Sequence, residues 1–299
     1  PPLTPMHEDG SLHLDLIEPY AELLIRDGVR GVFVCGSTGE SLSLTVAERM
    51  LIAQRWAEVA GDDLKILVQV GHNCLDDACT LAEHAGQLNV AGVAAIAPCF
   101  FRPQRVEDLV ADSAKIAAAA GSTPFFFYHI PAMTGVYLPM VDFLEQAAER
   151  IPNFKGLKFT HHDLYEFHRC LVASDGRFEL LWGRDELLLA AVTLGARGAV
   201  GTNYNYAAPL FLTMIDAFHR GDIDTARRHA GTITTFVAAL LEQGGLRAAK
   251  SMMKLRGIDC GPTRLPVHPW GEGGEAAWYD QVASLGIIEE IEALAAARQ

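Results

Sequence analysis

A lysine in an otherwise apolar segment is the first candidate for chemistry. The run KGLKFT places Lys158 between Leu157 and Phe159, and the alternation of a strand puts Lys158 on the face opposite these two residues. An ammonium that is buried without a partner tends to lose its proton. The neutral amine can attack a carbonyl and form a Schiff base, which withdraws electrons from a neighbouring carbon–carbon bond. The alternative is a lysine that reaches solvent or pairs with a buried carboxylate.

A tyrosine closes the apolar run PFFFYHIP. Period-two alternation places Tyr128 and Phe126 on one face and the other two phenylalanines on the opposite face. We therefore expect Tyr128 to face the same interior as Lys158. A phenol in that place can pass a proton to or from a substrate hydroxyl. A core tyrosine with a satisfied hydroxyl is the alternative.

The motif GSTGE, residues 36–40, directly follows the apolar run GVFVC. Its backbone N–H groups and the hydroxyls of Ser37 and Thr38 can hold a carboxylate or another small anion. The motif lacks the spacing and the lysine of a phosphate-binding P-loop. A plain turn between a strand and a helix is the alternative.

Acidic residues follow another apolar run in WGRDE, which contains Gly183, Asp185 and Glu186. Adjacent carboxylates do not face each other on a helix, so a shared metal site is not expected. Contacts to sugar hydroxyls, or the N-cap of a helix, are the two interpretations.

Three histidines, His161, His162 and His168, suggest metal binding at first sight. The first two are adjacent and are expected to point apart, as neighbours in a strand do. No HExxH motif or second set of ligands accompanies them, so the sequence does not predict a zinc site.

These residues lie in a repeating pattern of short apolar runs and longer segments with helical spacing. The predicted strands are 31–35, 66–70, 93–96, 124–128, 156–160, 179–182 and 198–201, with a truncated strand at 2–5 as the eighth. Helical patterns include 16–27, 46–59, 75–88, 106–119 and 186–194, and Thr45 and Glu48 form a capping box. Eight such units predict an α/β fold of the (β/α)8 TIM barrel type, with the active site at the carboxyl ends of the strands. A doubly wound sheet is the second possibility.

The pattern changes near residue 222, where helix begins to follow helix. The expected helices are 222–243, 246–255 and 276–296, interrupted by the Gly- and Pro-rich stretch 260–275. We expect residues 1–221 to form the catalytic barrel and residues 222–299 to form a C-terminal helical extension, packed on the barrel or on a neighbouring subunit.

Composition excludes several classes of function. The chain has 299 residues, is 50% hydrophobic and carries a formal net charge of −13 without any Lys/Arg-rich run, which argues against nucleic acid as a partner. No apolar run approaches the roughly 20 residues of a membrane-spanning helix. The six cysteines lack CxxC spacing, so we expect reduced thiols and a cytoplasmic protein.

Five motifs in order, GSTGE, YHIPAMTG, GLKFT, GRDE and GAVGTNYNY, resemble the N-acetylneuraminate lyase and dihydrodipicolinate synthase family of class I aldolases. The resemblance covers nearly the whole chain. It implies a (β/α)8 barrel with a helical C-terminal extension, assembled as a homotetramer. It also implies that pyruvate forms a Schiff base with the lysine of the sixth strand, here Lys158, without any other cofactor.

The resemblance also implies roles for individual residues. Ser37 and Thr38 would hold the pyruvate carboxylate, Tyr128 would shuttle a proton, and Thr160 would contact the substrate near Tyr128. Four residues would line the pocket for the polyol end of a sugar acid: Gly183, Asp185, Glu186 and Thr202. The family more often has serine at the position of Thr202.

Departures from the motifs favour one branch of the family. Synthases of the dihydrodipicolinate type carry an arginine after the tyrosine, whereas this chain reads Pro131, Ala132, Met133 and Thr134, and methionine cannot replace a bidentate cation. The synthases also use a tyrosine pair after the preceding strand, where this chain has Cys99 and Phe100 ahead of Phe101, Arg102 and Pro103.

The resemblance therefore implies a sialic-acid lyase, which reversibly cleaves N-acetylneuraminate to N-acetylmannosamine and pyruvate. Three alternatives stay open from the sequence. One is a sibling pyruvate-dependent aldolase or synthase that acts on another 2-keto-3-deoxy sugar acid. The others are a metal-dependent barrel hydrolase and a non-catalytic binding protein on the same scaffold.

Overall fold

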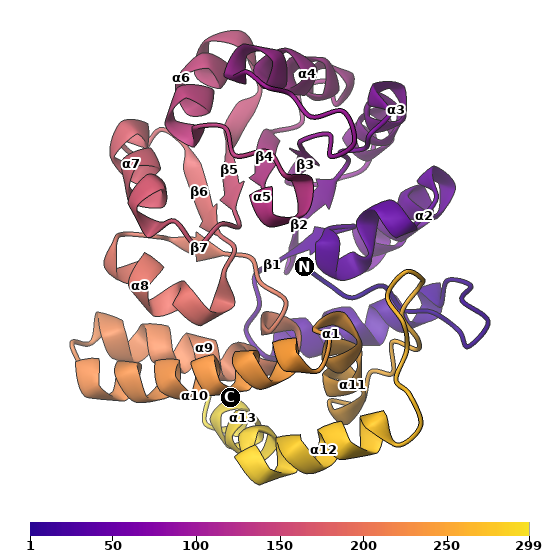
Figure 1. The fold of residues 1–299 in the computed structure, drawn as a ribbon, viewed down its shortest axis with the longest axis vertical. Helices are drawn as coiled ribbons and strands as arrows, with labels where there is room; N and C mark the ends of the chain where they lie inside the picture. Colours follow the sequence, from indigo (N-terminus) through magenta and orange to yellow (C-terminus); the bar gives the residue numbers. More distant parts are fainter. Residues whose placement is uncertain (299) are drawn as a thin grey trace.

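A computed structural model describes residues 1–298, and its centre is a curled sheet of parallel strands surrounded by helices (Figure 1). The strands are β1 Gly31–Val34, β2 Lys65–Gln69, β3 Gly92–Ile96, β4 Phe125–His129, β5 Phe154–Phe159, β6 Glu179–Trp182 and β7 Gly198–Ala199. They pair in the order β1 to β7 without reversal. A doubly wound sheet reverses its strand order, so the barrel prediction is confirmed and the second possibility is wrong.

Helices alternate with the strands, and the longer ones surround the sheet (Figure 1). They are α1 Ile17–Arg26, α2 Val46–Val59, α3 Leu75–Gly86, α4 Val106–Ala119, α5 Pro131–Thr134, α6 Met140–Arg150, α7 Leu164–Ser174, α8 Leu188–Thr193 and α9 Tyr204–His219. The capping box of α2 is confirmed, because Thr45 Oγ1 accepts from the Glu48 N–H while the Glu48 carboxylate accepts from the Thr45 N–H.

The eighth strand expected at residues 2–5 is wrong, since this segment pairs with neither β1 nor β7. Proline has no N–H to donate to a ladder, and Pro2 and Pro5 leave only two donors in the segment. The Leu3 N–H is used elsewhere, because it donates to the Tyr20 hydroxyl. The side chain of Thr4 also binds outside the sheet, because its hydroxyl donates to the Gly39 carbonyl. The segment thus binds the GSTGE turn instead of the sheet.

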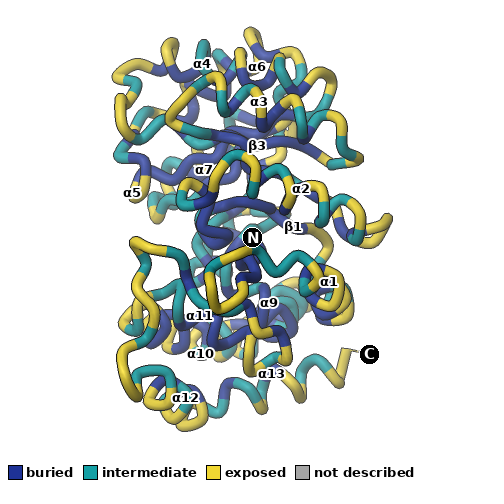
Figure 2. Tube along the Cα trace, turned by 90° about the vertical axis from the view of Figure 1, so that its right-hand side faces the viewer, coloured by how far each residue is buried: buried dark blue, intermediate teal, exposed yellow. Residues whose placement is uncertain are grey.

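Side chains of the strands alternate between two apolar cores, and the strands form the buried centre of Figure 2. One core lies inside the barrel and contains Phe33, Phe126 and Tyr128, whereas Leu157 and Phe159 belong to the larger core between sheet and helices. The orientations predicted for the two strands β4 and β5 are therefore confirmed.

Four helices form the C-terminal part of the chain and lie below the barrel in Figure 1. They are α10 Ile223–Glu242, α11 Leu246–Leu255, α12 Gly274–Leu285 and α13 Ile287–Ala296. The single helix expected at 276–296 is wrong, because it is divided at Gly286. This glycine has a φ of 61°, a left-handed conformation that ends a helix.

A cavity of about 760 Å³ lies at the end of the barrel where the strands begin. Strand starts such as Gly31, Lys65 and Gly198 line it, together with apolar side chains such as Leu67 and Leu181. None of the predicted site residues lines this cavity. The candidate active site must therefore be built from the opposite ends of the strands, as the barrel prediction requires.

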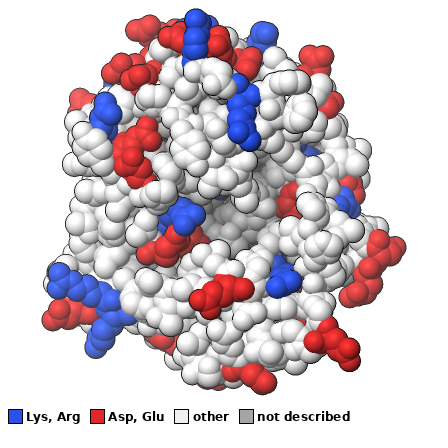
Figure 3. All heavy atoms as spheres, in the orientation of Figure 1, with Lys and Arg blue, Asp and Glu red and all other residues white. Residues whose placement is uncertain are grey.

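The surface charge, the helices and the cysteines agree with the composition of the chain. On the face shown in Figure 3, acidic and basic side chains are interspersed around a hollow near the middle. No helix within residues 1–298 is both long and apolar enough to cross a membrane. All six cysteines are free thiols, and Cys35, Cys170 and Cys260 are buried.

Candidate active site

Lys158 lies on β5 with its side chain inside the barrel, as predicted. The residue is only 2% exposed, and its partner in the register of β4 is Tyr128. The amine Nζ lies 3.9 Å from the ring centroid of Phe33 and 4.0 Å from that of Tyr128. Two aromatic rings thus enclose the amine at the carboxyl end of its strand.

Burial lowers the pKa of the Lys158 amine to about 7, and the Asp185 carboxylate opposes part of this shift. Lys158 forms no ion pair with the carboxylates of residues 1–298. Aromatic faces attract an ammonium less strongly than a paired carboxylate does. A large fraction of the side chain is therefore the neutral, nucleophilic amine at neutral pH.

Tyr128 is also buried, and its hydroxyl lies 3.1 Å from Ser37 Oγ. Burial raises the pKa of the Tyr128 phenol to about 12, although the hydroxyls of Ser37 and Thr160 oppose the rise. At neutral pH the resting phenol is protonated. It can donate a hydrogen bond, and it becomes a base only when a nearby positive charge stabilises the phenolate.

The GSTGE turn brings Ser37 and Thr38 to the carboxyl end of β1. Ser37 reaches Tyr128, while Thr38 Oγ1 lies 2.6 Å from Thr202 Oγ1. The turn is strained, because Cys35, Glu40 and Ser41 have φ values of 57°, 65° and 24°. Such conformations cost about 1–3 kcal/mol each for residues other than glycine, and they occur where the surrounding structure enforces them.

Asp185 is buried and is held by Asn203. Its Oδ2 accepts hydrogen bonds from the Asn203 backbone N–H at 2.8 Å and from the Asn203 side chain at 2.6 Å. Burial raises the pKa of Asp185, and these hydrogen bonds oppose the rise. The buried Oδ1 has no hydrogen-bond partner among residues 1–298. The N-cap interpretation of this residue is wrong, since no side chain caps the helical turn it begins.

Glu186 and Gly183 differ from Asp185 in their surroundings. The Glu186 carboxylate is only partly buried and pairs with Arg184 at 2.6 Å. A Cβ at Gly183 would overlap the Thr160 hydroxyl. Thr160 Oγ1 is itself buried and makes no hydrogen bond of good geometry among residues 1–298, although it lies near enough to Tyr128 to affect the pKa of the phenol, so it can contact a ligand beside that group.

The predicted site residues therefore meet at one end of the barrel, where the amine lies against the ring of Tyr128 and the phenol hydroxyl lies beside Ser37 of the turn. A model of the dihydrodipicolinate synthetase family matches residues 1–283. The chain belongs to the dihydrodipicolinate synthetase family. The resemblance inferred from the motifs is thereby confirmed.

Relatives within this family are similar over most of their length. The N-acetylneuraminate lyase of Rattus norvegicus is 38% identical over 270 residues, which cover 89% of this chain and 84% of the relative. The structure of N-acetylneuraminate lyase (sialic acid aldolase) from Aliivibrio salmonicida is 42% identical, with a TM-score of 0.93 over 96% of this chain and 95% of that one. The Proteus mirabilis N-acetylneuraminate lyase is 37% identical, with a TM-score of 0.93 over 96% and 97% of the two chains.

The histidines of this family member are arranged differently from the expectation. The rings of His161 and His162 do not point apart, because their centroids are 4.4 Å apart in an edge contact. Both residues lie in the bend after β5, where strand alternation no longer applies. Within residues 1–298, no group of three His, Cys, Asp or Glu side chains is arranged to hold a metal ion.

Two residues of the candidate site were missed from the sequence. Phe33 supplies one ring over the Lys158 amine, and Asn203 holds the Asp185 carboxylate. Alternation along GVFVC could have placed Phe33 inside the barrel. Asn203 directly follows Thr202 in the motif GTNYNY, but nothing in that spacing indicates which carboxylate it binds.

Proposed function

We propose that this chain is a Schiff-base aldolase that reversibly cleaves N-acetylneuraminate to N-acetylmannosamine and pyruvate. The observation that carries the proposal is the Lys158 amine, which is buried, has no ion pair within residues 1–298 and has a pKa lowered to about 7. The lyases that share 37–42% of its residues support the choice of substrate. We propose the cytoplasm as its location and a homotetramer as its assembly.

The first step is attack of neutral Lys158 Nζ on the C2 ketone of the open-chain sugar acid. The resulting carbinolamine takes up a proton at its hydroxyl and loses water, which leaves the protonated iminium. The hydroxyls of Ser37 and Thr38 and the N–H groups of the GSTGE turn would bind the C1 carboxylate. This clamp keeps the breaking bond aligned with the iminium, because the ketone and the carboxylate are held at two separate points.

The second step is breakage of the C3–C4 bond. Tyr128 first loses its phenol proton to solvent, and the phenolate then takes the proton of the C4 hydroxyl. The C4 oxygen becomes the aldehyde of N-acetylmannosamine, and the electrons of the broken bond move into the iminium to give an enamine. The phenol, with a pKa of about 12, is a weak base at rest. The iminium places a full positive charge beside it, since Nζ is 4.0 Å from the ring centroid, and this charge favours the phenolate.

The remaining steps release pyruvate. The enamine takes a proton at C3, and water then hydrolyses the iminium to pyruvate and free Lys158. All the electron movement occurs on the lysine adduct, so the proposed reaction uses no metal or other cofactor. Turnover that continues in a chelator would agree with this, whereas loss of turnover would favour the alternative of a metal-dependent hydrolase.

The sugar tail would be selected by the remaining polar residues of the site. Glu186 is the most accessible of them, and Asp185 and Thr160 each offer a buried oxygen without a partner. Thr202 already binds Thr38, so it would act at the boundary between the carboxylate clamp and the tail. Gly183 would serve by leaving room for Thr160.

Changing Glu186 to Ala tests this division of roles. We expect weaker binding or slower turnover of the sugar acid, with formation of the pyruvate adduct unchanged. The comparison of steady-state kinetics with reductive trapping of pyruvate measures both. Equal losses in the two assays would contradict the assignment.

A sibling aldolase is the second candidate, and one contact favours it. Arg102 comes from the loop after β3 and lies against Gly135, directly after α5. The segment 131–134 contains no arginine, but a guanidinium from another loop is thus present near it. Such a cation could serve an aldehyde that carries its own carboxylate.

The deciding experiment is a product assay with purified protein. We expect N-acetylneuraminate to be converted to equimolar pyruvate and N-acetylmannosamine, and the reverse reaction to prefer N-acetylmannosamine in a panel of aldehydes with pyruvate. A preference for an aldehyde that carries a carboxylate would select the sibling aldolase. Absence of any turnover, together with absence of a reducible pyruvate adduct, would select a non-catalytic binding protein.

A further inference from the structure

Glu40, the last residue of the GSTGE turn, is tied to a distant part of the chain. Its side chain is 2% exposed, and its Oε1 lies 3.0 Å from Nζ of Lys250 on α11, which is 4% exposed. Lys250 also donates to the Pro262 carbonyl at 2.6 Å. A buried ion pair with a further hydrogen bond fixes both side chains, because either charge left alone would be strongly unfavourable.

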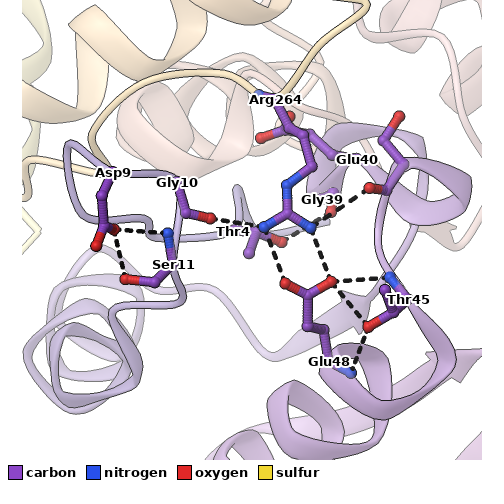
Figure 4. A network of polar contacts seen from close by, with 10 residues as sticks. Thr4, Asp9, Gly10, Ser11, Gly39, Glu40, Thr45, Glu48 and Arg264 are labelled. Carbon is purple, nitrogen blue, oxygen red and sulfur yellow. Dashed lines mark hydrogen bonds and ion pairs between the residues drawn. The ribbon is translucent and has the colours of Figure 1, made fainter.

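Arg264 completes the connection on the other side of the same carboxylate (Figure 4). Its backbone N–H donates to Glu40 Oε2 at 2.6 Å. Its guanidinium binds both carboxylate oxygens of Glu48 at 2.7 and 2.9 Å and the Gly10 carbonyl at 2.6 Å. Thr4 adds a hydrogen bond to the Gly39 carbonyl at 2.7 Å. The turn is therefore held from the outside by the N-terminal segment and by the chain that follows α11.

The same turn carries the hydroxyls at the reacting end. Within it, the Glu40 N–H donates to the Ser37 carbonyl at 3.1 Å, so movement of Glu40 would move Ser37 directly. Three of the four residues other than glycine with positive φ in residues 1–298 lie in this short stretch, at Cys35, Glu40 and Ser41. A strained turn keeps its shape only while the surrounding contacts enforce it.

We propose that Glu40, Lys250 and Arg264 are positioning residues that hold the GSTGE turn in its carboxylate-binding shape. The segment from α11 to Arg264 would then be needed for binding of the substrate carboxylate, although none of its residues touches the substrate. The proposal rests on the proposed role of the turn as the holder of the substrate carboxylate.

The test compares two ketones that differ in their carboxylate. Pyruvate and acetone are each trapped on Lys158 with cyanoborohydride over a range of concentrations, and the adduct is measured by mass spectrometry. In Lys250→Met we expect the half-saturating concentration of pyruvate to rise by about 10- to 100-fold. A small displacement of the groups that bind a substrate has an effect of this size. Trapping of acetone, which has no carboxylate to position, should match that of the unmodified protein.

The matched control is Lys254→Met on the same helix. Lys254 is 50% exposed and pairs with Asp259, so its replacement should change the trapping of neither pyruvate nor acetone. Glu40→Gln is the milder second variant, because it keeps the size of the side chain and removes only its charge. It should show the same selective loss for pyruvate, and it decides the question should Lys250→Met fail to fold.

Two results would overturn the proposal. One is normal pyruvate saturation in both Lys250→Met and Glu40→Gln. The other is an equal loss for pyruvate and acetone, which would indicate general damage to the barrel. An unmodified protein that forms no pyruvate adduct would instead overturn the proposed function itself, so the two failures are distinguishable.

Discussion

Lys158 and Lys250 are both almost fully buried, and their surroundings differ in one decisive respect. The Lys250 amine lies 3.0 Å from a buried carboxylate and also binds a backbone carbonyl. The Lys158 amine lies between two aromatic rings and has no ion pair within residues 1–298. Lys250 is therefore a buried lysine in an ion pair, whereas Lys158 is a buried lysine whose pKa falls because it has none within the described residues.

The difference teaches that burial alone does not make a nucleophile. An ion pair retains the proton and fixes the side chain, which suits a residue that holds a turn in place. Burial without a carboxylate partner favours the neutral amine, which suits attack on a carbonyl. Asp185 is the one acid that moderates the second case, because its charge partly opposes the fall in the pKa of Lys158.

The largest effect is expected from removing the reactive amine. Lys158→Met should reduce turnover by on the order of 10⁴-fold or more, as loss of a covalent nucleophile does, and it should abolish the pyruvate adduct. Lys155→Met is the control on the same strand, since Lys155 is 47% exposed and pairs with Glu179. Kinetics and mass spectrometry measure both variants. Substantial turnover in Lys158→Met would remove the distinction between the two buried lysines.

The next effect concerns the phenol beside the amine. Tyr128→Phe should lower kcat by about 10²- to 10⁴-fold, the usual contribution of a proton-transfer group. The ring over Nζ is kept in this variant, so Lys158 should still trap pyruvate. Loss of trapping together with turnover would mean that Tyr128 acts on adduct formation rather than on bond cleavage.

The same substitution at the two lysines should change stability in opposite directions. Lys158→Met removes a desolvated amine and should stabilise the fold by about 1–4 kcal/mol, whereas Lys250→Met leaves Glu40 buried alone and should destabilise it by about 3–5 kcal/mol. Urea unfolding monitored by circular dichroism measures both. Equal shifts in the free energy of unfolding would contradict the comparison.

The stabilisation by Lys158→Met should also depend on pH. The pKa of Lys158 is about 7 in the folded protein, whereas the ordinary value for a lysine is 10.5, so the unfolded chain binds more protons between these two values. The penalty of burying the lysine is thus largest below pH 7 and disappears as the pH approaches 10.5. The gain from methionine should shrink over the same range.

The smallest effect is expected at Asp185. Its carboxylate favours the charged amine, so Asp185→Asn should lower the pKa of Lys158 further and move the pH profile of adduct formation to lower pH. Glu186→Gln is the control, because it also removes one negative charge, at the next position in the chain. A profile that moves to higher pH would show that another group governs the amine.

The orientation of the central residues could be predicted from the sequence, because it depends on local alternation. Lys158 and Tyr128 face inward for the same reason that Phe159 faces the helices. The capping box at Thr45 was equally local. The eighth strand was wrong because two prolines remove donors and the segment instead binds the turn.

Contacts between distant segments could not be predicted in this way. Arg264 and Glu40 are 224 residues apart, and no spacing rule brings them together. Asn203 and Asp185 meet because two neighbouring strand ends converge, and the sequence indicates the strands but not the partners. The division of the chain at residue 222 into barrel and extension stays a prediction, although Lys250 and Arg264 bind closely to the barrel side.

The most direct test of the account is the pH dependence of pyruvate trapping on Lys158. The rate of adduct formation should rise with pH, with a midpoint near 7, and peptide mapping should find the label on Lys158. A midpoint near that of an ordinary lysine, about 10.4, or a label on another residue, would contradict the claim that burial without a partner makes this amine reactive.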